Sequence, residues 1–133
     1  MAFGTFDGLH KGHINFFKQA RALAVRPFLV VSVARDKNVR KIKKQHPDLN
    51  ERKRLALIKR CPLVDKAVLA GLENHLPHIL KERPDIIALG YDQKAYIRNL
   101  KKDLKNKSII VDIVRLKPYK EKIYKNYLLK KQR

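Results

Sequence analysis

The sequence predicts a single doubly wound α/β domain, with a five-stranded parallel sheet and helices on both faces. Short apolar runs alternate about five times with segments whose apolar residues recur at helical spacing. Most of these runs are nearly continuous, which is typical of parallel strands covered on both sides. The length of 133 residues suits one core, and neither a repeat nor a low-complexity linker divides the chain. We therefore expect one domain over residues 1–133.

The chain opens with a predicted strand at residues 1–3, whose three residues are all apolar. Residues 12–25 carry large apolar side chains at helical spacing and predict the first helix. Pro27 punctuates the connection that follows. Residues 28–34 form the longest apolar run and predict a second, buried strand.

The middle of the chain is more polar. Residues 37–44 are mostly basic and predict a short exposed helix or a loop. Asn50 is the residue type that caps helices, and the helix after it should bury Leu55, Leu57 and Ile58. Residues 66–69 predict a third strand.

The second half repeats the alternation. Residues 75–82 predict a helix, and residues 86–89 predict a buried strand. Residues 96–105 predict another helix, and residues 109–114 predict the last strand. The basic tail has apolar residues at 123, 127 and 128, which suggest a C-terminal helix. Since right-handed crossovers place all strand carboxyl ends at one edge, the loops after them should meet there and bind a ligand.

The segment Gly-Thr-Phe-Asp-Gly-Leu-His-Lys-Gly-His at residues 4–13 carries the predicted chemistry. It links the first strand to the first helix, and its three glycines allow close approach of a ligand. A helix N-terminus attracts phosphate through unpaired N–H groups and the helix dipole. With His10 and His13 at that helix start, the segment predicts a phosphate site. The alternatives are surface histidines or a metal pair, but no third His or Cys ligand lies at close spacing for zinc.

The His-x-Gly-His motif after an apolar strand resembles the signature of cytidylyltransferase-like nucleotidyltransferases, which are Rossmann-like. The resemblance covers nearly the full chain. Within that family, Ala-Arg-Asp at 34–36, Leu-Gly-Tyr-Asp-Gln at 89–93 and Arg-Leu-Lys-Pro-Tyr at 115–119 look most like archaeal FAD synthases.

The resemblance implies a role for each motif residue. His10, His13 and Lys43 would be catalytic, the histidines by stabilising charge on the α-phosphate and the lysine by reaching the triphosphate. Arg115 and Asn126 are further candidates for binding phosphate. The remaining residues would bind the nucleotide together with His10 and His13: Thr5, Phe6, Lys11, Gly12, Asp92 and Tyr119. Asp7 and Cys61 are interpreted as structural.

By the same resemblance the substrates are ATP and FMN, joined to FAD with release of pyrophosphate and with Mg²⁺ or another divalent metal. Two alternatives remain. One is a CTP-using enzyme similar to glycerol-3-phosphate cytidylyltransferases, and the other is a non-catalytic module that binds nucleotide or RNA. The family also implies a homodimer. One departure is the segment 123–127, where Asn126 and Tyr127 stand in place of the family's Ser/Thr pair.

The net charge of +20 favours anionic partners such as nucleotides. Nucleic acid fits the charge as well, but the basic residues are spread along the chain and no RNA-binding signature is present. No apolar run approaches the roughly 20 residues of a membrane span. The single cysteine excludes an internal disulfide and fits a reducing compartment. We therefore expect a soluble, cytoplasmic protein.

Overall fold

The computed structural model describes residues 1–43, 47–72, 75–91, 93 and 97–119. Its five strands are β1 (Ala2–Gly4), β2 (Val30–Val33), β3 (Lys66–Leu69), β4 (Ile86–Leu89) and β5 (Asp112–Arg115). They form one sheet in the order β3-β2-β1-β4-β5, and all four pairings are parallel. The predicted doubly wound α/β fold is confirmed.

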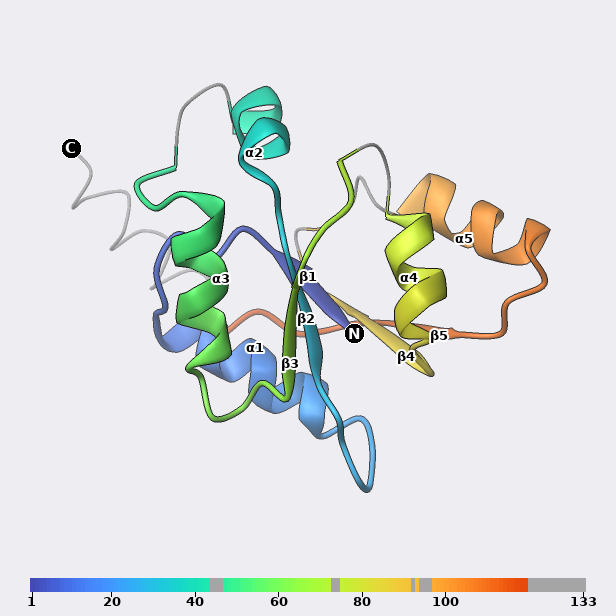
Figure 1. The fold of residues 1–133 in the computed structure, drawn as a ribbon. Coiled ribbons are helices and arrows are strands. Elements are labelled where there is room, and N and C mark those ends of the chain that lie inside the picture. The colour runs from blue at the N-terminus through green and yellow to red at the C-terminus, as the bar shows by residue number, and fades with distance from the viewer. Residues whose placement is uncertain (44–46, 73–74, 92, 94–96, 120–133) are drawn as a thin grey trace.

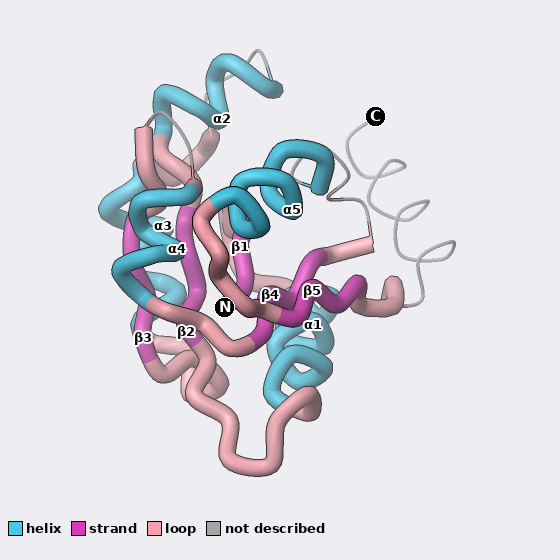
Figure 2. Tube along the Cα trace, turned by 90° about the vertical axis from the view of Figure 1, so that its right-hand side faces the viewer, coloured by secondary structure: helices cyan, strands magenta, loops and turns pink. Residues whose placement is uncertain are grey.

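In the part of the chain that the structure describes, five helices connect and flank the strands. They are α1 (Lys11–Arg21), α2 (Asp36–Lys43), α3 (Glu51–Lys59), α4 (Leu76–Glu82) and α5 (Ile97–Asn106). Figure 1 shows α1 and α3 to one side of the sheet and α4 and α5 to the other. Figure 2, turned by 90°, shows the strands as a central layer beside α1 and α5.

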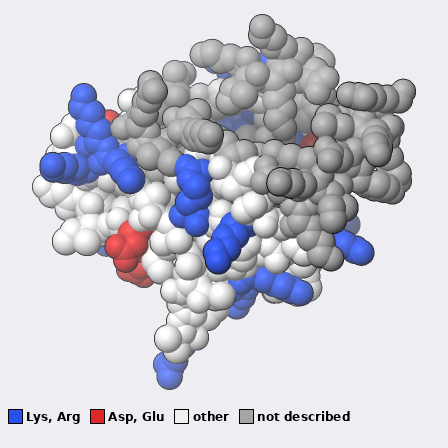
Figure 3. All heavy atoms as spheres, turned by 180° about the vertical axis from the view of Figure 1, so that it is seen from behind, with Lys and Arg blue, Asp and Glu red and all other residues white. Residues whose placement is uncertain are grey.

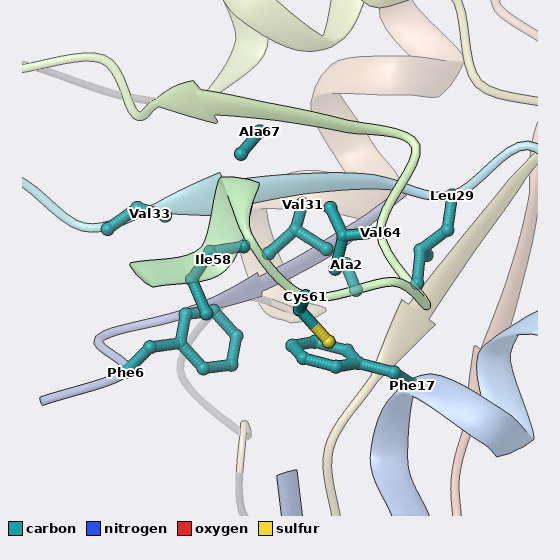
Figure 4. Packing of buried hydrophobic residues seen from close by; sticks show 10 residues of the cluster. All are labelled: Ala2, Phe6, Phe17, Leu29, Val31, Val33, Ile58, Cys61, Val64 and Ala67. Atoms are coloured by element: carbon teal, nitrogen blue, oxygen red, sulfur yellow. The ribbon is translucent and has the colours of Figure 1, made fainter. Parts of the chain in front are cut away.

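The core has two parts because helices cover both faces of the sheet. On one face Phe17 of α1 and Ile58 of α3 pack against Val31 and Val33, together with the buried thiol of Cys61 (Figure 4). The ten buried residues of this cluster include Phe6, from the loop after β1. On the other face Ile79 of α4 and two leucines of α5 pack against Phe3 and Ile87.

Three predicted boundaries differ from the structure. The first helix ends at Arg21 instead of residue 25, and Val25 is fully exposed. The second strand begins at Val30 and the last begins at Asp112, while Phe28 and Ile110, which we expected within them, are 67% and 97% exposed. An apolar run predicts burial but does not fix where a helix or strand ends, and Leu29 is buried although it lies outside the strand. The polar segment after β2 is the helix α2, and its Val39 side chain is buried.

The order of the strands places a switch point beside β1. From β1 the chain moves first to β2 and β3 on one side, and then crosses to β4 and β5 on the other. In sheets of this kind ligands bind at the carboxyl edge where the strand order reverses. The β1–α1 loop, which contains the glycine and histidine segment, leaves the sheet at this point.

Candidate active site

The loop after β1 is held tightly at its start. Phe6 has a left-handed backbone with φ of 56°, and its ring is buried. A Cβ atom at Gly4 would lie 2.5 Å from Cζ of that ring, so only glycine fits there. The Phe6 ring also makes an edge contact with His13, at 5.3 Å between centroids. The loop is therefore anchored in the core close to a predicted catalytic histidine.

His10 and His13 form a capping box at the N-terminus of α1. Nδ1 of His10 accepts hydrogen bonds from the backbone N–H groups of Gly12 at 3.0 Å and His13 at 3.4 Å. In return, Nδ1 of His13 accepts from the backbone N–H of His10 at 3.3 Å. The two rings stack, with 3.7 Å between centroids and an interplanar angle of 23°. Local backbone bonds thus fix both ring orientations.

These bonds determine the tautomer of each neutral ring. A neutral imidazole that accepts at Nδ1 carries its proton at Nε2 and can donate only there. Burial lowers the pKa of His10 below its ordinary value of 6.5, which favours the neutral ring at pH 7. Stacked rings also repel each other if both are charged. The site therefore has two Nε2–H donors at a helix N-terminus, an arrangement that binds phosphate oxygens.

Arg115 and Gln93 fasten the loop after β4. The Arg115 guanidinium donates to the carbonyl oxygens of Gly90 at 2.7 Å, Tyr91 at 3.1 Å and Gln93 at 3.4 Å. The Gln93 amide donates to the carbonyl oxygen of Phe3 and accepts from the N–H of Gly90, both at 2.8 Å. Arg115 thus contacts the backbone on both sides of position 92, and its role in phosphate binding stays a prediction.

A cavity of about 520 Å³ lies beside α1, and His10, Lys11 and Tyr119 are among the residues that line it. The segment before Tyr119 is held by Gln19 of α1. The Gln19 amide accepts from the N–H of Lys117 at 2.9 Å and donates to its carbonyl oxygen at 2.8 Å. The fold thus brings Tyr119 to the histidine loop, although more than 100 residues separate them.

Some of the other predicted site residues lie in described parts of the chain, and some do not. Thr5, Phe6 and Gly12 lie in or next to the same loop. Lys43 is the last residue of α2. Asp92 and Asn126 lie outside the described residues, as do Tyr127 and the predicted C-terminal helix. The roles of all these residues stay predictions.

Three residues whose contacts were not predicted from the sequence support the site: Gln19, Gln93 and Arg54. Arg54 donates to the carbonyl oxygen of Thr5. Asp7, which we interpreted as structural, accepts from the backbone N–H groups of Asp48 and Leu49, both at 2.7 Å. These contacts join segments distant in sequence, so no local pattern indicates them.

The described residues contain no cluster of three His, Cys, Asp or Glu side chains that would hold a metal ion. Mg²⁺ in nucleotide enzymes usually keeps several waters and is bound by substrate phosphates with one or two carboxylates, so it does not require such a cluster. Within the described ranges, no helix has the length and apolar character to cross a membrane. On the face shown in Figure 3, Lys and Arg form several separate groups instead of one patch.

The parallel sheet, the glycine loop and the histidine-capped helix fit the predicted class of nucleotidyltransferases. The family model for cytidylyltransferase-like proteins matches residues 1–129, and the chain belongs to that family. Its relatives include an FAD synthase from Korarchaeum cryptofilum, 47% identical over 117 residues, covering 87% of this chain and 79% of the relative. Another FAD synthase, from Methanosarcina barkeri, is 42% identical over 121 residues, or 91% and 84% of the two chains.

A solved structure supports the fold independently. It is described as a lipopolysaccharide core biosynthesis protein from Thermoplasma volcanium. It superimposes with a TM-score of 0.82 and 40% sequence identity, covering 90% of this chain and 95% of that one. The family match and the FAD synthase relatives confirm the predicted family and enzyme class.

Proposed function

We propose that this protein is an FMN adenylyltransferase, which transfers AMP from ATP to FMN and releases pyrophosphate. The observation that carries the proposal is the His10–His13 capping box. Because both Nδ1 atoms accept backbone hydrogen bonds, each neutral ring has its donor at Nε2, at the N-terminus of α1. The acceptor is supported by the similarity to FAD synthases at 41–47% identity over most of the chain.

The reaction forms one bond and breaks one. A phosphate oxygen of FMN attacks the α-phosphorus of ATP, the bond between that phosphorus and the bridging oxygen breaks, and pyrophosphate leaves with the electron pair. Because a phosphate monoester has a second pKa near 6, the FMN nucleophile is largely ionised at pH 7 and needs no strong general base. The protein supplies position and charge neutralisation.

His10 and His13 would donate Nε2–H hydrogen bonds to the α-phosphate oxygens, whose charge grows in the transition state. Lys43 would neutralise the β- and γ-phosphates, and Mg²⁺ carried by the triphosphate would add charge there. Tyr119, in the wall of the cavity beside α1, would contact the nucleotide. We assign no covalent enzyme intermediate to this site.

A product assay tests the proposal. Purified protein is incubated with Mg²⁺ and each pairing of ATP or CTP with FMN or glycerol-3-phosphate, and the products are separated by chromatography. FAD formed from ATP and FMN, with stoichiometric pyrophosphate, is the expected result. CDP-glycerol from CTP would instead assign the glycerol-3-phosphate reaction. No product from any pairing would contradict the proposal and favour a non-catalytic nucleotide-binding module.

A further inference from the structure

Arg54 is buried in an unusual environment. Its side chain, on α3, has 0% exposure, and among the residues whose burial the structure describes it is the only charged one that is buried. A guanidinium removed from water is costly unless hydrogen bonds and an opposite charge replace its hydration. Its partners therefore matter more than those of an exposed arginine.

Three nitrogen atoms of Arg54 donate to three different segments. Nη1 donates to the carbonyl oxygen of Thr5 at 2.8 Å, and Nε donates to that of Leu49 at 3.0 Å. Nη2 donates to the carboxylate of Asp36 at 2.6 Å. A planar guanidinium can satisfy several acceptors in fixed directions at once, which a lysine ammonium on a flexible stem does not.

The Asp36 carboxylate belongs to a wider network. Its second oxygen accepts from the backbone N–H of Glu51 at 3.1 Å, and the Glu51 carboxylate accepts from the backbone N–H of Asp36 at 3.0 Å. Glu51 also pairs with Arg35 at 2.9 Å. Burial alone would raise the pKa of Asp36, but hydrogen bonds from Arg54 and Glu51 and the charges of Arg54 and Arg40 outweigh it and lower that pKa. The carboxylate is therefore ionised, and the N-terminus of α2 is joined to that of α3.

The segments that meet at Arg54 also carry the predicted phosphate ligands. Thr5 begins the loop that leads to His10, and Asp36 is the first residue of the helix that ends in Lys43. The histidine loop and the lysine helix follow different strands, and Arg54 connects both to α3. We propose that Arg54 is a positioning residue, whose guanidinium fixes the loop after β1 relative to α2 so that both reach one triphosphate. Only the expected effect on the kinetics rests on the proposed function.

Arg54→Lys is the first variant, because it keeps the positive charge beside Asp36 while removing the planar three-way contact. Arg21→Lys is the matched control. Arg21 likewise donates to a carboxylate, that of Asp65 at 2.6 Å, and to a backbone carbonyl, that of Leu63 at 3.0 Å. Because Arg21 lies at the far end of α1 from the histidines, its loss should leave the site intact. Asp36→Asn provides a second test if Arg54→Lys folds poorly.

The first readout is amide hydrogen exchange, which needs no substrate. In Arg54→Lys or Asp36→Asn, we expect exchange to rise at least about tenfold in both residues 5–10 and residues 36–43, with α5 unchanged. In Arg21→Lys these two segments should exchange as in the wild type. A rise confined to one of them, or spread equally over the chain, would overturn the proposal.

The second readout is steady-state kinetics well below each variant's melting temperature. We expect kcat of Arg54→Lys to fall about 10²-fold, with a smaller change in KM for ATP, because the phosphate-binding groups remain but their alignment is lost. Arg21→Lys should retain wild-type kcat. Equal losses in the two variants, or an unchanged kcat in Arg54→Lys, would overturn positioning. A wild type without activity contradicts the proposed function instead, and the exchange experiment then decides the role of Arg54.

Discussion

The side-chain amide of Gln19 pairs with both backbone polar groups of Lys117, 98 residues away. Its Nε2 also donates to Oδ1 of Asn15, one helical turn earlier, at 2.7 Å. The pairing resembles one step of a strand ladder and holds the segment that leads to Tyr119 against α1. The uncharged side chain of Gln19 thus helps to shape the wall of the cavity beside His10.

Replacing Gln19 by Met should weaken ATP binding, because two hydrogen bonds, each contributing about 1 kcal/mol, no longer hold the Tyr119 segment. We expect the dissociation constant for ATP, measured by calorimetry, to rise about tenfold.

A double variant provides the control for that prediction. If Gln19 acts through Tyr119, adding Tyr119→Ala to Gln19→Met should cost much less than it does in the wild type. Fully additive losses of binding free energy would show that Gln19 acts elsewhere.

The two ring nitrogens of His10 can be tested separately. His10→Asn keeps an acceptor near Nδ1 and so should preserve the helix cap, but it removes Nε2–H. We expect the melting temperature of His10→Asn to stay near that of the wild type while kcat falls about 10²–10³-fold. The measurements are thermal unfolding and the rate of product formation.

His10→Gln is the complementary variant, since its amide reaches toward the Nε2 position and gives up the cap. We expect it to lose about 1 kcal/mol of unfolding free energy and to keep more activity than His10→Asn. The reverse order of activities would mean that capping, and not donation from Nε2, is the function of His10.

Lys43 and Lys37 lie on the same helix and allow a comparison of equal charge changes. Lys43→Met should reduce kcat/KM for ATP by about 10²-fold if Lys43 neutralises the triphosphate in the transition state. Lys37→Met removes the same charge at the exposed start of α2 and should change kcat/KM by less than about threefold. Similar losses in both variants would indicate a general effect of the basic surface.

The fold and the loop between β1 and α1 were predictable because their signals are local. Alternating apolar runs indicate the parallel sheet, and the spacing of glycines and histidines indicates the strand, loop and capped helix. The burial of Arg54 is a feature that such local signals do not predict. We expected Leu55, Leu57 and Ile58 on the buried side of α3. Ile58 is fully buried and Leu55 packs against the core, but the fully buried Arg54 was not expected. A hydropathy pattern assigns an arginine to solvent, and only its distant partners at Thr5 and Asp36 explain the burial.

The histidines on the other face of the sheet predict a pH dependence of stability. His75 and His78 make edge contacts with Phe3 at 5.1 and 5.9 Å, and Nε2 of His78 lies 3.0 Å from Oγ of buried Ser32. Burial and then the charge of His78 lower the pKa of His75 to about 4. Burial also lowers the pKa of His78, although the Glu82 carboxylate opposes the shift. Both rings thus resist protonation in the folded protein.

The two imidazoles take up protons near pH 6.5 in the unfolded state, but only at lower pH in the folded state. The unfolded state therefore binds more protons between about pH 6.5 and 4. The free energy of unfolding should therefore decrease as pH falls through this window, by at most about 2 kcal/mol at pH 5 because the rings are partly exposed. Chemical unfolding of the wild type and His75→Phe at pH 7.5 and pH 5 checks this. The variant should lose less stability on acidification, and an equal loss in both proteins would assign the acid sensitivity to other groups.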